Sequence, residues 1–185
     1  MATVVLRPTS TTSQTGWSAD PYPNAADDDT GTSVSQNSTT CDWIAVLEDL
    51  NGSLSGATIN SFTISANGKA GRAGAAVAAM SLIHSSDGEF AIEHENWTTT
   101  QNTQTTAAVN KQQDGSSALT YAYINNCSVR IDPNTQGITL YELYVTVDYT
   151  ATAPGYSHNI MGLAAASIGK VNSLATANIG KISGT

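Results

Sequence analysis

The sequence has few charged residues and very few basic ones. Of 185 residues, 7 are Lys or Arg and 15 are Asp or Glu, so charged residues make up 12% and the formal net charge is −8. Soluble domains usually hold about 25% charged residues. A protein that binds nucleic acid needs a basic surface that displaces counterions from phosphate. Seven scattered basic residues do not provide one, so we expect no nucleic-acid partner.

Long apolar runs and cysteine motifs are lacking as well. No run approaches the roughly 18 residues of a membrane-spanning helix, so we expect no membrane partner. Residues 1–8 lack the apolar stretch of a signal peptide, which predicts synthesis and folding in a cytoplasm. Cys41 and Cys127 are too far apart for a metal-clip or redox motif, and two cysteines are too few for a disulfide framework. We expect both cysteines to be free and buried, and to pack as small hydrophobic side chains.

Patterns typical of enzymes are missing too. The three histidines, His84, His94 and His158, do not form a zinc-binding spacing with each other or with cysteine, and no Gly-x-Ser-x-Gly elbow occurs. The acidic run at residues 27–29 offers oxygen ligands but lacks the glycine and the spaced carboxylates of a calcium loop. We therefore predict no catalytic residue, no metal site and no cofactor.

The most suggestive polar triplet is Glu93-His94-Glu95. Strand alternation would place both carboxylates on one face and His94 on the other, together with Phe90 and Ile92. Carboxylates two residues apart on a strand usually form a solvated face. We expect His94 to be a core or interface histidine, and the alternative is a ligand-binding residue.

What the sequence does contain is alternation with period two, separated by turn signals. Residues 140–149 place Tyr141, Leu143, Val145, Val147 and Tyr149 against intervening polar positions. Shorter alternations cover residues 3–7, 58–65, 77–83, 89–97 and 119–131, whereas residues 41–50 suit a short helical turn. Turns are expected at Asn51-Gly52, Asn67-Gly68, Asp87-Gly88, Asp114-Gly115 and Asp132-Pro133. The pattern predicts an all-β fold, an antiparallel β-sandwich.

The composition changes near residue 154 and divides the chain into a body, residues 1–153, and a tail, residues 154–185. The tail has two Lys and no Asp or Glu, which leaves a body charge of −10. Residues 163–172 are repeated at 174–183 with an offset of eleven. Glycine and serine have low helix propensity and disfavour a stable isolated helix, so we expect an irregular or partly helical tail. Such a segment docks on another protein or stays an unattached terminus.

Trp97 is the tryptophan whose exposure bears most on function. It begins a polar run that ends at Thr106. An exposed Trp97 would mark an interface or a ligand face, and stacking on sugar rings would make the chain a carbohydrate-binding module.

Motifs at the two ends of the chain resemble those of a known class of protein. Val5-Leu6-Arg7-Pro8, Gly16-Trp17, Asp27-Asp28-Asp29-Thr30 and Asp42-Trp43-Ile44 resemble a jelly-roll domain of structural proteins from tailed bacteriophages. Its last strand looks like Val145–Tyr149, and the resemblance implies that Trp17 and Trp43 lie in the core. The tail is similar to the Ala/Asn-Ile-x-Lys-Val-Asn-Gly repeats that end many phage virion proteins, with Ser173 in place of the usual glycine.

The resemblance implies a non-catalytic virion structural protein assembled in the bacterial cytoplasm. A capsid decoration (cement) protein is the first interpretation, and a neck or tail fibre or whisker component that contacts the host surface is the alternative. The implied partners are the major capsid protein or other virion proteins, and a small homo-oligomer, with a trimer favoured, is expected. The apolar tail residues that recur in the repeat are the expected docking anchors: Leu163, Ile168, Val171, Leu174, Ile179 and Ile182.

Overall fold

The computed structural model describes residues 1–71, 76–133, 137–152, 170–171 and 174–175. The chain divides into two compact units, Met1–Thr150 and Ala151–Thr185, and each is described by itself.

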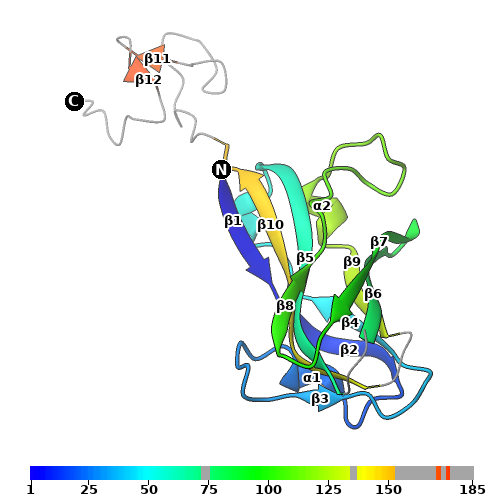
Figure 1. Ribbon diagram of the computed structural model, residues 1–185. Helices are drawn as coiled ribbons and strands as arrows, with labels where there is room; N and C mark the ends of the chain where they lie inside the picture. Colours follow the sequence, from blue (N-terminus) through cyan, green and yellow to red (C-terminus); the bar gives the residue numbers. More distant parts are fainter. Residues whose placement is uncertain (72–75, 134–136, 153–169, 172–173, 176–185) are drawn as a thin grey trace. The chain divides into compact units, whose positions relative to one another are not determined.

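The first unit is a sandwich of two five-stranded sheets in which all strand pairs are antiparallel (Figure 1). Sheet A has the order β1-β10-β5-β8, with β3 also paired to β10, and sheet B has the order β2-β4-β9-β6-β7. Sheet A comprises β1 (Ala2–Leu6), β3 (Val34–Ser35), β5 (Thr58–Ala70), β8 (Asn102–Thr105) and β10 (Ile138–Thr150). Sheet B comprises β2 (Pro8–Thr15), β4 (Asp42–Leu47), β6 (Ala76–His84), β7 (Gly88–Trp97) and β9 (Cys127–Pro133). The predicted antiparallel β-sandwich is confirmed.

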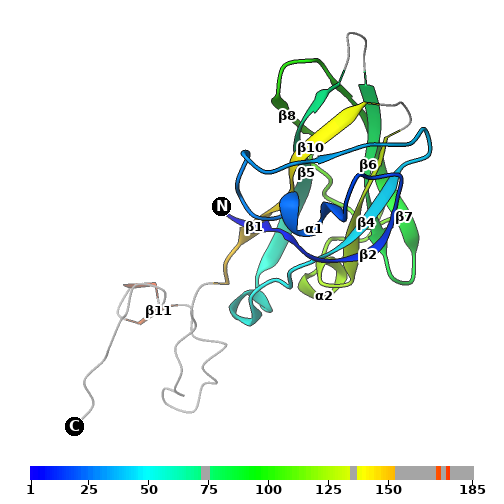
Figure 2. The same ribbon diagram turned by 90° about the horizontal axis from the view of Figure 1, so that it is seen from below.

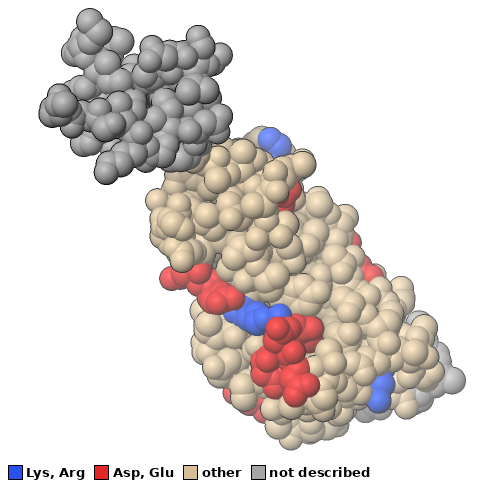
Figure 3. Space-filling view, turned by 90° about the vertical axis from the view of Figure 1, so that its left-hand side faces the viewer, with Lys and Arg blue, Asp and Glu red and all other residues tan. Residues whose placement is uncertain are grey.

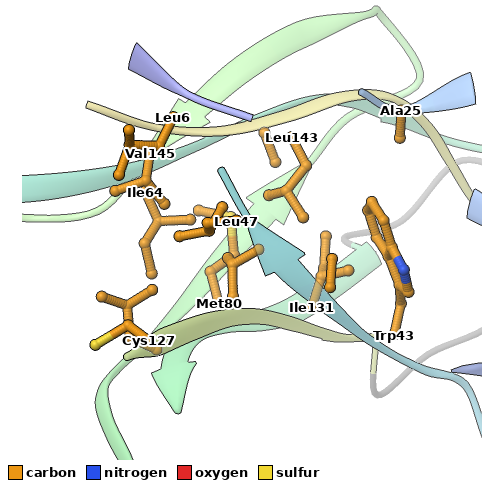
Figure 4. Packing of buried hydrophobic residues seen from close by; sticks show 14 of the residues in the cluster. Leu6, Ala25, Trp43, Leu47, Ile64, Met80, Cys127, Ile131, Leu143 and Val145 are labelled. Atoms are coloured by element: carbon orange, nitrogen blue, oxygen red, sulfur yellow. The ribbon is translucent and has the colours of Figure 1, made fainter. Parts of the chain in front are cut away.

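The core lies between the sheets because each strand turns alternate side chains inward. In β10, Leu143, Val145 and Val147 are fully buried, whereas Tyr144 and Thr146 between them are half-exposed. Figure 4 shows the inward side chains of the two layers facing each other, among them Leu6, Ile64 and Val145 from sheet A and Met80 and Ile131 from sheet B. The alternation predicted for residues 140–149 is therefore the core side of the central strand.

One long connection closes the end of the sandwich opposite the N-terminus. It runs from β2 to β4 and carries α1 (Pro21–Asn24) and β3, which lie together at that end (Figures 1 and 2). The amide of Leu143 donates to the carbonyl of Ala25 at 2.8 Å, and the amide of Gln36 donates to the carbonyl of Ile138 at 2.8 Å. The connection is thus hydrogen-bonded to β10.

Three sequence-based expectations about local structure are wrong. Residues 42–47 form strand β4 instead of a helical turn, because they pair with β2 and β9 and bury Trp43, Ala45 and Leu47 between the sheets. The segment 119–131 is not one strand, since α2 (Tyr121–Ile124) precedes β9. Asn67-Gly68 lies inside β5 and makes no turn. A Cβ at Gly68 would come within 3.0 Å of the Trp97 indole nitrogen, so the glycine makes room for a packed ring.

A register shift in β7 reverses the faces expected around His94. The pairing with β6 shifts between Met80 and Leu82, opposite Ala91, whose φ is +54°. One extra residue moves every later side chain to the other face. Phe90 is therefore buried while Ile92 and His94 are exposed, so the expectation of a core histidine is wrong for this monomer.

The second unit is described at four residues. β11 (Lys170–Val171) and β12 (Leu174–Ala175) form a short antiparallel pair, with Val171 opposite Leu174. These four residues are extended. The rest of the tail lies outside the described residues.

A substitution at Gly16 tests the tight packing at the start of the long connection. Its φ is +73°, and a Cβ there would overlap the carbonyl oxygen of Thr40. Gly16→Ala is expected to lower the free energy of unfolding by about 3 kcal/mol, measured by urea denaturation. Gly115 is the matched control, because its φ is +69° but a Cβ would meet nothing within 4 Å. Gly115→Ala is expected to cost about 1 kcal/mol, and equal losses would contradict the packing described.

Candidate binding surfaces

Arg7 occupies the corner where the chain passes from sheet A to sheet B. β1 ends at Leu6 and β2 begins at Pro8, a position at which a strand tolerates proline. The Arg7 guanidinium pairs with Glu142 of β10 at 2.5 Å and with Asp28 of the long connection at 2.6 Å. The side chain of Glu142 is 12% exposed, so its charge requires a partner. Arg7 therefore holds the corner and the connection together.

The backbone and the ring next to this corner add further contacts. The amide of Arg7 donates to Glu48 Oε1 at 2.8 Å, and the amide of Glu48 donates to the carbonyl of Arg7 at 2.9 Å. The guanidinium also lies 5.6 Å from the centroid of the Tyr144 ring. Figure 3 shows a basic patch between two acidic patches on this face. The positive charge is thus already neutralised by the protein.

The acidic run at residues 27–29 closes turns. Asp27 Oδ1 accepts from the amide of Asp29 at 3.1 Å, and Asp29 Oδ1 accepts from the amide of Gly31 at 2.8 Å. The Thr32 hydroxyl donates to Asp27 Oδ2 at 2.7 Å, and this bond lowers the pKa of Asp27. Within the described residues, no group of three or more His, Cys, Asp or Glu could hold a metal ion.

The N-terminal motifs contact each other in two pairs, one at each end of β2. Arg7 binds Asp28 next to Pro8, and the Trp17 indole nitrogen donates to the carbonyl of Asp42 at 3.1 Å beyond Thr15. Trp17 and Trp43 are both buried, as expected. Both contacts attach the long connection to its neighbouring strands.

A second arginine organises the outer face of sheet B. Arg130 of β9 contacts Asp42 of β4 at 2.7 Å, Glu89 of β7 at 2.9 Å and Asp132 at 3.2 Å. The Ser81 hydroxyl of β6 donates to Glu89 at 2.5 Å. The bond to Asp42 is the main cause that raises the pKa of Arg130 above its usual range. Four neighbouring strands are joined by this network, which leaves two negative charges in excess.

Hydroxyls and amides cover the outer face of sheet A. Four rows of neighbours cross its strands: Thr3–Asp148–Ser61, Val5–Thr146–Thr63, Tyr144–Ser65–Thr105 and Glu142–Asn67–Thr103. We call these residues the hydroxyl face. At one end the side chains satisfy each other, with Ser65 to Thr105 at 2.9 Å and Asn67 to Thr103 at 3.0 Å.

The other end of the hydroxyl face is less satisfied. Asp148 Oδ1 is buried and has no hydrogen-bond partner among the described residues. Thr3 and Ser61 flank it in the same row. The exposed Thr3 and the half-buried Ser61 leave hydroxyl groups at this end that can exchange hydrogen bonds with a polar partner.

A third polar surface lies where β7 and β8 form the edges of the two sheets. Beyond the shift in β7, Glu93, Glu95 and Trp97 share the inward face. Glu93 accepts from the amide of Ala107 at 3.0 Å, and Gln104 donates to the carbonyl of Asn96 at 2.8 Å. We call Glu93, Glu95 and Gln104 the polar edge. Burial, and secondarily the charge of Glu93, raises the pKa of Glu95.

The histidine at the β6–β7 hairpin has a serine and an aspartate nearby but not in a catalytic arrangement. His84 Nδ1 lies 3.2 Å from the Ser86 hydroxyl and 3.3 Å from Asp87. A catalytic triad uses the two ring nitrogens for its two partners, whereas here both face the same one. The ring stacks on Tyr123 with centroids 3.9 Å apart and packs the hairpin against α2.

The remaining candidate residues are placed as follows. Trp97 is fully buried, so the expectation of a surface aromatic is wrong; the register shift in β7 turns its ring into the core. Cys41 and Cys127 are free and buried, as predicted, and burial raises the pKa of both thiols to about 12. The anchors Leu163, Ile168, Ile179 and Ile182 lie outside the described residues. No helix in the described part of the chain is long and apolar enough to cross a membrane.

No protein-family model and no curated protein matches the chain. Among solved structures it is similar to the C-terminal CBM6 of the laminarinase LamC from Zobellia galactanivorans, with 10% identity and a TM-score of 0.45 over 79% of this chain and 98% of that one. It is also similar to the Podospora anserina GH26-CBM35 β-(1,4)-mannanase, with 11% identity and a TM-score of 0.45 over 85% and 30%.

A further similar structure is the CBM35 from Paenibacillus barcinonensis, with 15% identity and a TM-score of 0.41 over 82% of this chain and 100% of that one. CBM6 and CBM35 are carbohydrate-binding modules. At these identities and TM-scores the likeness carries no argument about a ligand.

Glu95 provides a test of the polar edge. The pKa of Glu95 is raised in the folded protein, so ionisation of this carboxyl destabilises the fold at pH values above its unfolded pKa of about 4.5. Below that pH the carboxyl is protonated in both states, and the destabilisation disappears. Glu95→Gln is therefore expected to raise the Tm at pH 7 by about 2 °C and to change it little at pH 4, measured by calorimetry. Asp49→Asn, at an exposed carboxylate, measures the general effect of removing one negative charge. A lower Tm at pH 7, or equal shifts at both pH values, would contradict the assignment.

Proposed function

We propose that this protein is a non-catalytic structural protein of a bacteriophage particle. In this proposal the sandwich is displayed and the tail docks on other virion proteins. The observation that supports it is that motifs carrying the resemblance contact each other in pairs. Arg7 binds Asp28, and the Trp17 indole nitrogen donates to the carbonyl of Asp42, so each of these motifs has a structural role in the body. The surface charges of Arg7 and Arg130 are internally paired, which suits binding through shape and neutral polar groups.

Docking through the tail is the proposed mechanism of attachment. Leu163, Ile168, Val171, Leu174, Ile179 and Ile182 are the proposed anchors, with the major capsid protein or another virion protein as the partner. Many copies of one weak contact over a shell give large avidity. A homotrimer of the sandwich would present three tails together and strengthen each attachment.

Two positions in the particle are compatible with this attachment. A decoration protein would cover the head lattice and stabilise the shell, whereas a fibre or whisker would lie at the neck or tail. Cryo-electron microscopy of purified particles separates them by location. Absence of the protein from particles would overturn the virion proposal in both forms.

The tail anchors can be tested in the same particles. Ile168→Asp combined with Ile179→Asp is expected to reduce incorporation at least about tenfold, because two charges replace apolar anchor side chains. The measurement is the copy number per particle by quantitative mass spectrometry, with circular dichroism showing that the body stays folded. Ile92→Asp, at a 52% exposed isoleucine of the body, is the matched control and should incorporate normally. Normal incorporation of the double variant would contradict docking by the tail.

A second candidate function, recognition of neutral glycans, is favoured by the hydroxyl face. Thr3 is exposed, and Ser61, Thr63 and Asp148 are half-buried, at one end of this face. Sugar hydroxyls donate to carboxylates and exchange hydrogen bonds with threonine and serine. This function fits the fibre form of the proposal, in which the sandwich meets the host surface, and it also fits a carbohydrate-binding module outside any virion.

Glycan recognition predicts losses confined to one face. Asp148→Ala and Thr63→Val are each expected to weaken binding of a neutral polysaccharide about tenfold, because each removes a hydrogen-bonding group. Binding is measured by calorimetry after a screen of neutral polysaccharides. Thr12→Val, at an exposed threonine of β2 in the other sheet, is the control. No binding in the screen, or equal loss in the control, would contradict this function.

A further inference from the structure

The three tryptophan side chains differ in how their indole nitrogens are satisfied. Trp17 donates to the carbonyl of Asp42 at 3.1 Å, and Trp43 donates to the hydroxyl of Thr11 at 3.0 Å. Trp97 is fully buried, and its indole nitrogen has no hydrogen-bond partner among the described residues. A buried donor without a partner costs about 1–3 kcal/mol, so such a group calls for an explanation.

A second unsatisfied atom lies beside the first. Asn102 Oδ1 is also buried and without a partner in the described part of the chain. Asn102 of β8 is directly opposite Gly68 of β5, and the Trp97 indole nitrogen lies 3.0 Å from the point where a Cβ of Gly68 would be. Opposite residues of an antiparallel pair point to the same face, with Cβ positions about 5 Å apart. The amide oxygen of Asn102 and the indole nitrogen of Trp97 therefore border the same small space over Gly68.

A third polar atom borders this space. The backbone carbonyl oxygen of Thr139 lies 3.1 Å from the same Cβ position of Gly68. The indole N–H can only donate, whereas the two carbonyl oxygens can only accept. The group that can bridge the two unsatisfied side-chain atoms and this carbonyl is an oxygen that accepts one hydrogen bond and donates two. Water has this capacity, and buried waters typically make about three hydrogen bonds.

We propose that one structural water binds over Gly68, accepts from Trp97 and donates to Asn102 and to the carbonyl of Thr139. Trp97 belongs to β7 of sheet B, and the other three residues belong to sheet A. The water thus joins the two sheets where their edge strands β7 and β8 meet. Gly68 is required because any side chain there would fill the site. This inference is independent of the proposed function.

The test is the contact between water and the indole protons in the full chain labelled with ¹⁵N. Trp97 Hε1 is expected to show a direct cross-peak with water in NOE and ROE spectra. The sign of this cross-peak is expected to be that of a water bound for longer than about a nanosecond. Trp17 Hε1 is the internal control, because its nitrogen donates to a backbone carbonyl. Trp43 is less suitable, since it donates to an exchanging hydroxyl. No cross-peak at Trp97 would overturn the proposal.

A variant and a crystal structure test the bridge itself. Asn102→Leu removes the acceptor at similar volume and is expected to abolish the Trp97 cross-peak, while the Trp17 and Trp43 indole signals stay unshifted. An unchanged cross-peak in Asn102→Leu would overturn the bridge to Asn102. A crystal structure should show one water within about 3.2 Å of both Trp97 Nε1 and Asn102 Oδ1. A direct hydrogen bond between these two side chains would overturn the proposal even if the variant failed to fold.

Discussion

The passage of the chain from one sheet to the other at Arg7 is the constraint on which the rest of the body depends. A single residue separates β1 in sheet A from β2 in sheet B. Its side chain meets the nearly buried carboxylate of Glu142, and its backbone is hydrogen-bonded to Glu48 after β4. A buried charge that loses its partner is strongly destabilising, so this pair ties the N-terminal strands to the central strand β10. The long connection is held by the same guanidinium through Asp28.

The use of charge inside these networks shapes what the surface can recognise. Arg7 and Arg130 each face several carboxylates, so neither offers a free positive charge to a partner. The body carries an excess of acid, and its sheet A exposes rows of threonine, serine and asparagine. Under either proposed function, neutral polar contacts would therefore dominate recognition. Binding by many copies makes individually weak contacts of this kind effective.

Sequence patterns predicted the fold where burial follows a simple period. The alternation in residues 140–149 identified the central strand because one of its faces is covered along its whole length. The strands β2 and β8 carry mostly Thr, Ser, Gln and Asn, so their backbone pairing has no hydrophobic signature. Residues 43–47 are apolar without interruption, so they show no period-two alternation, and pairing with two neighbouring strands made them a strand.

The sequence by itself determined the fold class and the free and buried state of Cys41 and Cys127. These follow from composition and local period, which act along the chain. The core positions of Trp17 and Trp43 were implied by the resemblance, and both residues are buried. Only the tertiary structure decided which face Trp97 occupies, since one extra residue in β7 reverses every later side chain. It alone brought Arg7 to Glu142 and Gly68 to Trp97, because those contacts join residues that are distant in sequence and depend on strand order, which alternation does not encode.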